Sequence, residues 1–146
     1  MELIMLGTGN AMVTRCYNTC FVLSSGEENF LVYAVCGNGI LKHLEQAGVP
    51  FTGIREMFVT HAHTDHILGA IWVIRKIATL MSNDKYRRNF IVYGHNEVID
   101  ALRTFCRLTL PGKILKYIDE RIFWGEVKDG TRKEILGLPL CFFDIL

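Results

Sequence analysis

The sequence predicts an α/β protein in which a mixed β-sheet carries helices packed on one face. Two observations support this fold class. Short strand-like segments alternate with helical segments through most of the chain, and the last third returns to closely spaced strands. The length of 146 residues is typical of one hydrophobic core, so we expect a single domain over residues 1–146.

Each expected strand is a short run of aliphatic, β-branched or aromatic residues bounded by turn residues. The first run is apolar at every position and is therefore expected to be buried, and Asp129-Gly130 marks a turn between two of the late strands. The expected strands lie, in chain order, at residues 3–6, 19–23, 30–35, 56–60, 89–93, 122–127, 133–136 and 140–145.

The expected helices are defined by apolar spacing and by residues that start or end a helix. The longest is apolar around much of its circumference, which is typical of a buried helix, and part of its surface is expected to lack a cover in this chain. The expected helices are one opened by Gly37 and Gly39 and ended by Gly48, one from about Ile67 to Met81, one capped by Asn96, and a short one at residues 113–118.

Composition excludes several classes of protein. Half of the residues are hydrophobic and 21% are charged, which excludes a disordered chain. The formal net charge of +1 lacks the overall positive charge of a general nucleic-acid binder, although a local patch remains compatible with it. No apolar run reaches the roughly 18 residues that a membrane span needs. Five irregularly spaced cysteines favour reduced thiols, so a cytoplasmic location and no membrane partner are expected.

A cluster of histidines carries the strongest chemical signal. Three of the five histidines fall in the segment His61–His66, which reads HAHTDH and follows an apolar strand. Strand alternation places His61 and His63 on one side, and Asp65 and His66 can approach from the other flank as the chain turns into a helix. Imidazole and carboxylate ligands suit a divalent metal, with zinc expected first and iron or manganese as alternatives.

Four ligands so close together are hard to place around one ion, so two ions are the simpler arrangement. His61 and His63 would hold one ion, while Asp65 and His66 would hold the other. Two ions about 3.5–4 Å apart can activate water and bind the oxygens of a phosphodiester or ester. Asp65 is also the candidate catalytic residue, as a proton carrier. The structural alternative is a histidine-rich surface loop, or a helix start at which Asp65 only favours the helix dipole.

The segment His61–His66 resembles the His-x-His-x-Asp-His motif of the metallo-β-lactamase superfamily. Residues 6–9 (LGTG) after the first strand, and residues 30–32 before a glycine-containing turn, match that superfamily in order and spacing. The pattern is similar to the phosphodiesterase branch of ribonuclease Z-like enzymes. This resemblance implies the first half of an αββα sandwich, a two-metal site formed by segment 61–66, and a phosphodiester or ester substrate, with RNA among the candidates.

Three features differ from this family. Tyr33 stands where the family has an aspartate that supports the metal loop, and only Arg15 and Asn18 remain of an element linked to tRNA recognition. The family's later ligands are absent from a sequence that ends at Leu146. These differences favour an alternative: a truncated or degenerate non-catalytic half-domain that binds metal weakly and either self-associates or needs a completing chain.

Weaker signals lie elsewhere. The loop at residues 7–9 (GTG) could bring backbone N–H groups close to a phosphate, with a plain tight turn as the alternative. The basic segment 85–88 could touch a nucleic-acid backbone, although a solvated loop is expected because the total charge is nearly neutral. His95 could border the cleft, with a surface position as the default. His43 is expected to face solvent.

Overall fold

The computed structural model describes residues 1–33 and 37–145. Within these residues it contains the strands β1 (Glu2–Gly7), β2 (Cys20–Ser25), β3 (Glu28–Val32), β4 (Ile54–Phe58), β5 (Phe90–Gly94), β6 (Ile122–Glu126), β7 (Arg132–Ile135) and β8 (Leu138–Cys141). The helices are α1 (Gly39–Gln46), the 3₁₀ turn η1 (Phe51–Gly53), α2 (Thr64–Ser82), α3 (Asn96–Thr109) and α4 (Gly112–Leu115).

Six of these strands form one mixed sheet, in the order β1-β2-β3-β4-β5-β6. The pairs β1–β2 and β2–β3 are antiparallel, whereas β3, β4, β5 and β6 are parallel neighbours. β3, β4 and β5 are each followed along the chain by a helix, as parallel connections require. The predicted α/β class with a mixed sheet is confirmed.

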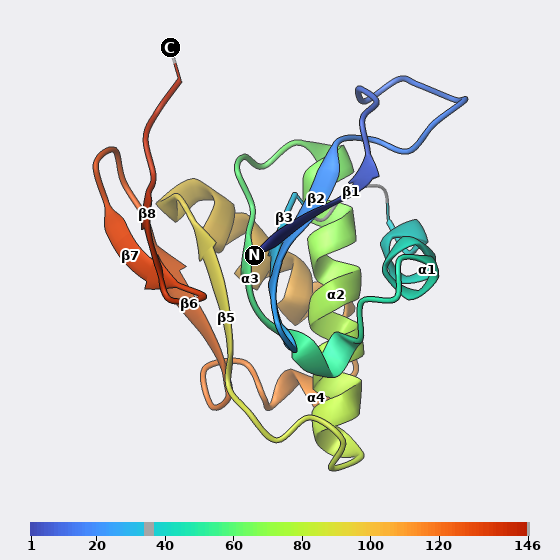
Figure 1. Cartoon of the computed structure of the whole chain (residues 1–146). Coiled ribbons are helices and arrows are strands. Elements are labelled where there is room, and N and C mark those ends of the chain that lie inside the picture. The colour runs from blue at the N-terminus through green and yellow to red at the C-terminus, as the bar shows by residue number, and fades with distance from the viewer. Residues whose placement is uncertain (34–36, 146) are drawn as a thin grey trace.

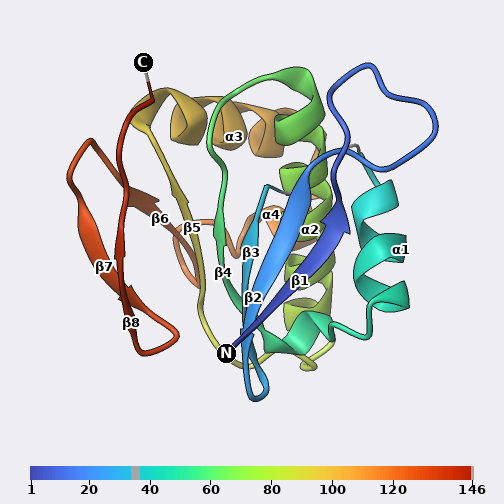
Figure 2. The same cartoon turned by 45° about the horizontal axis from the view of Figure 1, so that its top comes forward.

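The helices cover one face of the sheet, and the hairpin of β7 and β8 lies on the other side, next to β5 and β6 (Figures 1 and 2). The larger core joins the helical face of the sheet to α1, α2, α3 and α4. A smaller core lies on the opposite face and includes Phe30, Tyr93, Ile135 and Phe142. The hairpin therefore covers the part of the second face that these residues form.

The long helix α2 begins at Thr64, three residues before the predicted start. Ten of its residues are buried, in agreement with its predicted position in the core. Leu68 and Trp72 are exposed, so the expectation that part of this helix lacks a cover agrees with the structure. The early start places Asp65 and His66 in the first helical turn, with His63 as the N-cap.

The expectation that the first strand is buried is wrong. β1 is an edge strand, and Leu3 and Met5 are 58% and 48% exposed. Side chains alternate along a strand, so Ile4 and Leu6 pack on the helical core while Leu3 and Met5 point to the opposite face. The β7–β8 hairpin lies at the other end of the sheet and does not cover them.

Several predicted boundaries move. β3 ends at Val32; the predicted end at Val35 lies outside the described residues. Asn96 is not the cap of α3, because His95 holds that position. The last strand is β8, which is four residues long and replaces the predicted run 140–145. The turn before it, Leu136-Gly137, has φ values of 55° and 75°, which suit a tight hairpin.

Two further predictions concern the whole chain. No helix within residues 1–33 and 37–145 is long and apolar enough to cross a membrane. The assignment of residues 1–146 to one domain stays a prediction.

Candidate functional site

The predicted site lies at the edge of the sheet where the parallel strands β3 and β4 end. Beyond Phe58 the chain stays beside β5, because the Val59 N–H donates to the Tyr93 carbonyl at 3.0 Å. It then reaches His61 and turns at His63 into α2. Ligand sites of α/β sheets form at this carboxyl edge of the strands.

All four predicted site residues line one pocket of about 360 Å³. The loop between β1 and β2 forms the opposite wall, so residues far apart in the sequence face each other across the pocket. The lining residues are Gly9, Asn10, Ala11, Asn18, Thr19, Tyr33, His61, His63, Asp65 and His66.

The three imidazole rings lie against one another, with His61 between the other two. Its ring centroid is 4.4 Å from that of His63 and 4.0 Å from that of His66. Thr60 Oγ1 lies 2.8 Å from Nδ1 of His61. This hydroxyl does not contact the other ring nitrogen of His61, Nε2. The histidines are thus gathered in one place, unlike the separate side chains of a solvated surface loop.

Asp65 makes two polar contacts in the pocket through the same oxygen. Its Oδ2 lies 3.3 Å from His66 Nε2 and accepts a hydrogen bond of 3.4 Å from Asn18 Nδ2. Asn18 is buried and comes from the loop before β2. No local pattern predicts this contact, because 47 positions separate the two residues.

Burial lowers the pKa of both His61 and His66 from the ordinary value. The neighbouring imidazoles lower these pKa values further, and the Asp65 carboxylate opposes the effect. Both rings are therefore neutral near pH 7, which is the form that binds metal. His66 Nδ1 is also buried without a hydrogen-bond partner among the described residues.

The donor set fits a divalent transition metal in its chemistry. Neutral imidazoles and a carboxylate are suitable ligands for such an ion. Across residues 1–33 and 37–145, however, no three His, Cys, Asp or Glu side chains are arranged to hold an ion. The four side chains line one pocket, but their ligand atoms do not surround one position for an ion. Metal coordination by His61, His63, Asp65 and His66 therefore stays a prediction.

The glycine loop before β2 does not present free N–H groups to a phosphate. The N–H groups of Thr8 and Gly9 both donate to the Tyr17 carbonyl, at 3.0 and 2.8 Å. These two N–H groups are therefore not available to a phosphate, and residues 7–9 pair with residues 17–20 instead of forming a tight turn. Gly9 nevertheless lines the pocket. A Cβ on Gly7 would lie 2.3 Å from the Asn18 carbonyl oxygen, so the close approach of these backbones requires glycine.

Tyr33 occupies the position where the family resemblance led us to expect an aspartate. Its ring centroid lies 5.2 Å from that of His66, and it lines the pocket. His66 thus has an aromatic ring beside it where a second carboxylate was expected. The sequence identified the replacement but did not predict this contact.

A second cavity of about 700 Å³ adjoins the pocket, between the sheet and the segment that follows β8. Tyr33 and His61 line both cavities. His95 also lines the second cavity, so it borders the cleft as one of its two interpretations proposed. Phe143 and Ile145, at its C-terminal side, are 70% and 87% exposed.

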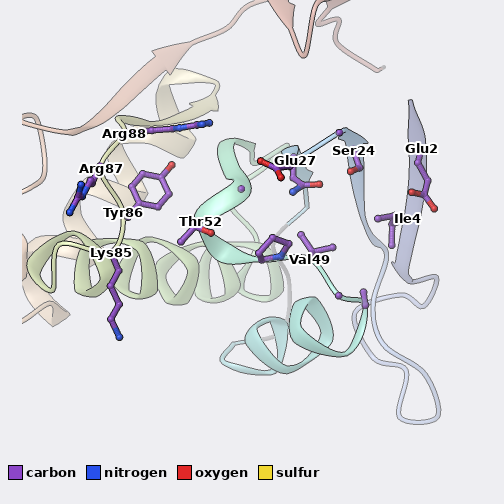
Figure 3. Close-up of a pocket in the computed structure, with 16 residues that line it drawn as sticks. Glu2, Ile4, Ser24, Glu27, Val49, Thr52, Lys85, Tyr86, Arg87 and Arg88 are labelled. Atoms are coloured by element: carbon purple, nitrogen blue, oxygen red, sulfur yellow. The ribbon is translucent and has the colours of Figure 1, made fainter.

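The basic segment 85–88 lies at the opposite edge of the sheet, beside a cavity of about 790 Å³ (Figure 3). Tyr86 is buried, whereas the three basic side chains are exposed. Lys85 and Arg88 point in different directions (Figure 3). Arg88 Nη1 lies 3.3 Å from Glu28 Oε1, so part of its charge is paired. These observations agree with the expected solvated loop.

His43 departs from its expected solvent-facing position. Its ring stacks on Tyr17 with 3.7 Å between centroids, and burial lowers its pKa.

Comparison with known proteins identifies two related groups. A family described as Anti-Pycsar protein Apyc1 matches residues 1–106. Ribonuclease Z from Pyrococcus abyssi (strain GE5 / Orsay) is 31% identical over 144 residues, which cover 90% of this chain and 45% of that protein. Anti-Pycsar protein Apyc1 from Bacillus phage 010DV004 is 35% identical over 69 residues, which cover 47% of this chain and 26% of that protein.

A solved structure supports the fold. The metallo-β-lactamase fold protein YhfI from Bacillus subtilis has a TM-score of 0.65 at 18% identity, covering 90% of this chain and 48% of that one. The chain spans 40% and 45% of the length of two ribonuclease Z relatives that it matches. The predicted superfamily is confirmed, although no residue pattern predicted the Apyc1 match. The chain belongs to the Anti-Pycsar protein Apyc1 family, and its fold is the ribonuclease Z-like N-terminal half of the metallo-β-lactamase superfamily.

Proposed function

We propose that this chain is a metal-dependent hydrolase that acts on phosphodiesters. The observation that carries the proposal is the gathering of His61, His63, Asp65 and His66 in one pocket at the carboxyl edge of the sheet. The resemblance of segment 61–66 to the His-x-His-x-Asp-His motif implies that these side chains bind metal. Zinc is the proposed metal, with iron and manganese as alternatives, because the donors are nitrogen and oxygen.

The residues of the pocket have distinct proposed roles. His61, His63, Asp65 and His66 hold the metal, with two ions in the complete site. Divalent ions supply Lewis-acid polarisation of a phosphodiester and activation of water. Asn18 keeps Asp65 oriented toward His66 through its hydrogen bond to Oδ2. Asp65 can also carry a proton during the reaction.

The proposed substrate is a phosphodiester, with RNA as the first candidate. Relatives matched over about nine-tenths of this chain are named ribonuclease Z. The net charge of +1 provides no overall positive charge for binding RNA, and Lys85 and Arg88 of the basic segment point in different directions (Figure 3). Cys16, Cys106 and Cys141 are free thiols, which supports a cytoplasmic location.

A second candidate function is a half-domain that is inactive until another polypeptide or a second copy completes the site. Two observations favour it. The exposed side chains of Phe143 and Ile145 border the second cavity, which opens beside His61. Tyr33 replaces the expected supporting carboxylate next to His66. In this case the isolated chain binds metal weakly and hydrolyses nothing.

Metal analysis with a matched histidine control tests the proposal. The purified chain is dialysed against zinc or manganese, its metal content is measured, and hydrolysis of bis(p-nitrophenyl) phosphate is followed. We expect bound metal in the wild-type chain and in His43→Asn, and loss of metal and turnover in His63→Asn. A wild-type chain that retains no metal after supplementation contradicts the proposal.

Light scattering of the same samples separates the two candidates. A metal-saturated monomer with turnover rejects the half-domain. Metal binding without turnover, together with self-association, supports the half-domain and contradicts hydrolysis by a single chain.

A further inference from the structure

Tyr33 has a backbone conformation that a bulky side chain rarely adopts. Its φ is 61°, in the left-handed region that favours glycine. Such conformations persist where surrounding contacts hold them, and they cluster at binding and catalytic sites. The position of Tyr33 beside the histidine pocket therefore calls for an explanation in terms of what its ring contacts.

Both the backbone and the ring of Tyr33 are held in place. Its N–H donates to the Phe58 carbonyl at 3.1 Å, which ties the end of β3 to the end of β4. The ring centroid lies 6.4 Å from that of Phe21 on β2 and 5.2 Å from that of His66 in the first turn of α2. The left-handed residue thus brings an aromatic ring close to both elements.

His66 has few other restraints on the orientation of its ring. Its Nδ1 is buried and makes no hydrogen bond with the described residues, and its Nε2 contacts only the nearby Asp65 carboxylate, at 3.3 Å. A metal-binding histidine is normally oriented by a hydrogen bond from its other ring nitrogen. Here ring packing by His61 and Tyr33 takes the place of that hydrogen bond.

We propose that Tyr33 is a positioning residue: its ring packs on His66 and holds that imidazole in the orientation and dry surroundings that metal binding needs. The inference rests on the proposed function, because it treats His66 as a ligand. The hydroxyl of Tyr33 has no part in it, so phenylalanine serves at this position and an aliphatic residue of similar size does not.

Two readouts test the role of the ring. The first is the dissociation constant for Co²⁺ alone, from an absorption titration. The second is the NMR spectrum of the metal-free protein, in which the His66 ring protons sense the ring current of a neighbouring aromatic. The variants are Tyr33→Leu, Tyr33→Phe and the control Phe123→Leu, which removes an exposed aromatic ring from β6.

We expect Tyr33→Leu to weaken Co²⁺ binding by about 10–100-fold, the effect of losing a group that orients a ligand. The His66 ring resonances of this variant shift in the metal-free protein. Tyr33→Phe and Phe123→Leu retain wild-type affinity within about twofold, with His66 resonances close to those of the wild type. If Tyr33→Leu does not fold, Tyr33→Asn replaces it, because asparagine tolerates the left-handed region.

The outcomes distinguish this inference from the proposed function. A wild-type chain that binds Co²⁺, with unchanged affinity in Tyr33→Leu, overturns the inference and leaves the proposed function standing. Equal weakening in Phe123→Leu also overturns it, since the effect is then general. A wild-type chain that binds no Co²⁺ overturns the proposed function, and the metal-free NMR spectrum then decides alone: unchanged His66 resonances in Tyr33→Leu overturn the inference.

Discussion

Replacing Gly7 by alanine tests how tightly the β1–β2 loop is held against the site. A Cβ at this position would lie 2.3 Å from the Asn18 carbonyl oxygen and 2.5 Å from that of Tyr17. Comfortable contact needs roughly 3.5 Å, so one backbone segment must move by roughly 1 Å. Both obstacles are backbone atoms of a loop fixed by hydrogen bonds, and a rotamer change cannot relieve the clash.

The expected cost of Gly7→Ala is about 1–3 kcal/mol of unfolding free energy, the range for overpacking. For a chain of this size that loss lowers Tm by about 3–10 °C. Thermal unfolding followed by circular dichroism in EDTA measures it without any contribution from metal. The movement of Asn18 also separates its side chain from Asp65, so metal affinity falls together with stability.

Gly112→Ala is the matched control. Gly112 begins α4, and a Cβ there meets no atom within 4 Å. Alanine is expected to leave stability unchanged or to raise it by up to about 1 kcal/mol. The reasoning is refuted if the Tm of Gly7→Ala lies within about 1 °C of the wild-type value. It is equally refuted if Gly112→Ala loses as much stability as Gly7→Ala.

Three further predictions follow from particular contacts. Asn18→Leu removes the donor to the site carboxylate and should weaken metal binding by about 10–100-fold, measured by competition with a chromogenic chelator; unchanged affinity contradicts the role. Tyr86 donates to the Ile54 carbonyl at 2.8 Å, so Tyr86→Phe should cost about 0.5–1.5 kcal/mol in urea unfolding. Burial raises the pKa of Tyr86 to about 12, above its unfolded value. The stability that depends on the protonated hydroxyl is therefore complete below pH 10 and is lost as pH rises from 10 toward 12. The phenylalanine variant should lack this decline. Burial also raises the pKa of the Cys106 thiol to about 12, so iodoacetamide at pH 8 should alkylate the exposed Cys141 and spare Cys106, as peptide mass mapping would show; equal labelling contradicts it.

The sequence predicted those elements that are determined by the pattern of neighbouring residues in the chain. The histidine segment follows its strand directly, so its place at the end of β4 could be inferred from neighbouring residues. The burial of α2 followed from its apolar circumference. The start of α2 was predicted three residues too late, because Thr64, Asp65 and His66 are polar and carry no apolar spacing of their own. Their inclusion in the helix depends on the cap at His63.

Features that depend on tertiary neighbours could not be inferred in this way. Leu3 and Met5 look like core residues, and only the position of β1 at the sheet edge explains their exposure. His43 looks like a surface residue until Tyr17 is placed beside it. The contact between Asn18 and Asp65 joins positions too distant for any local pattern to reveal.

The two cavities beside the histidines have a common wall, formed by Tyr33 and His61. A substitution at either residue therefore changes the lining of both cavities at once. Asn18 borders the histidine pocket alone, and Cys141 borders the neighbouring cavity alone. An inhibitor or a labelling probe can therefore reach one cavity without the other only through residues that line a single cavity, such as Asn18 or Cys141.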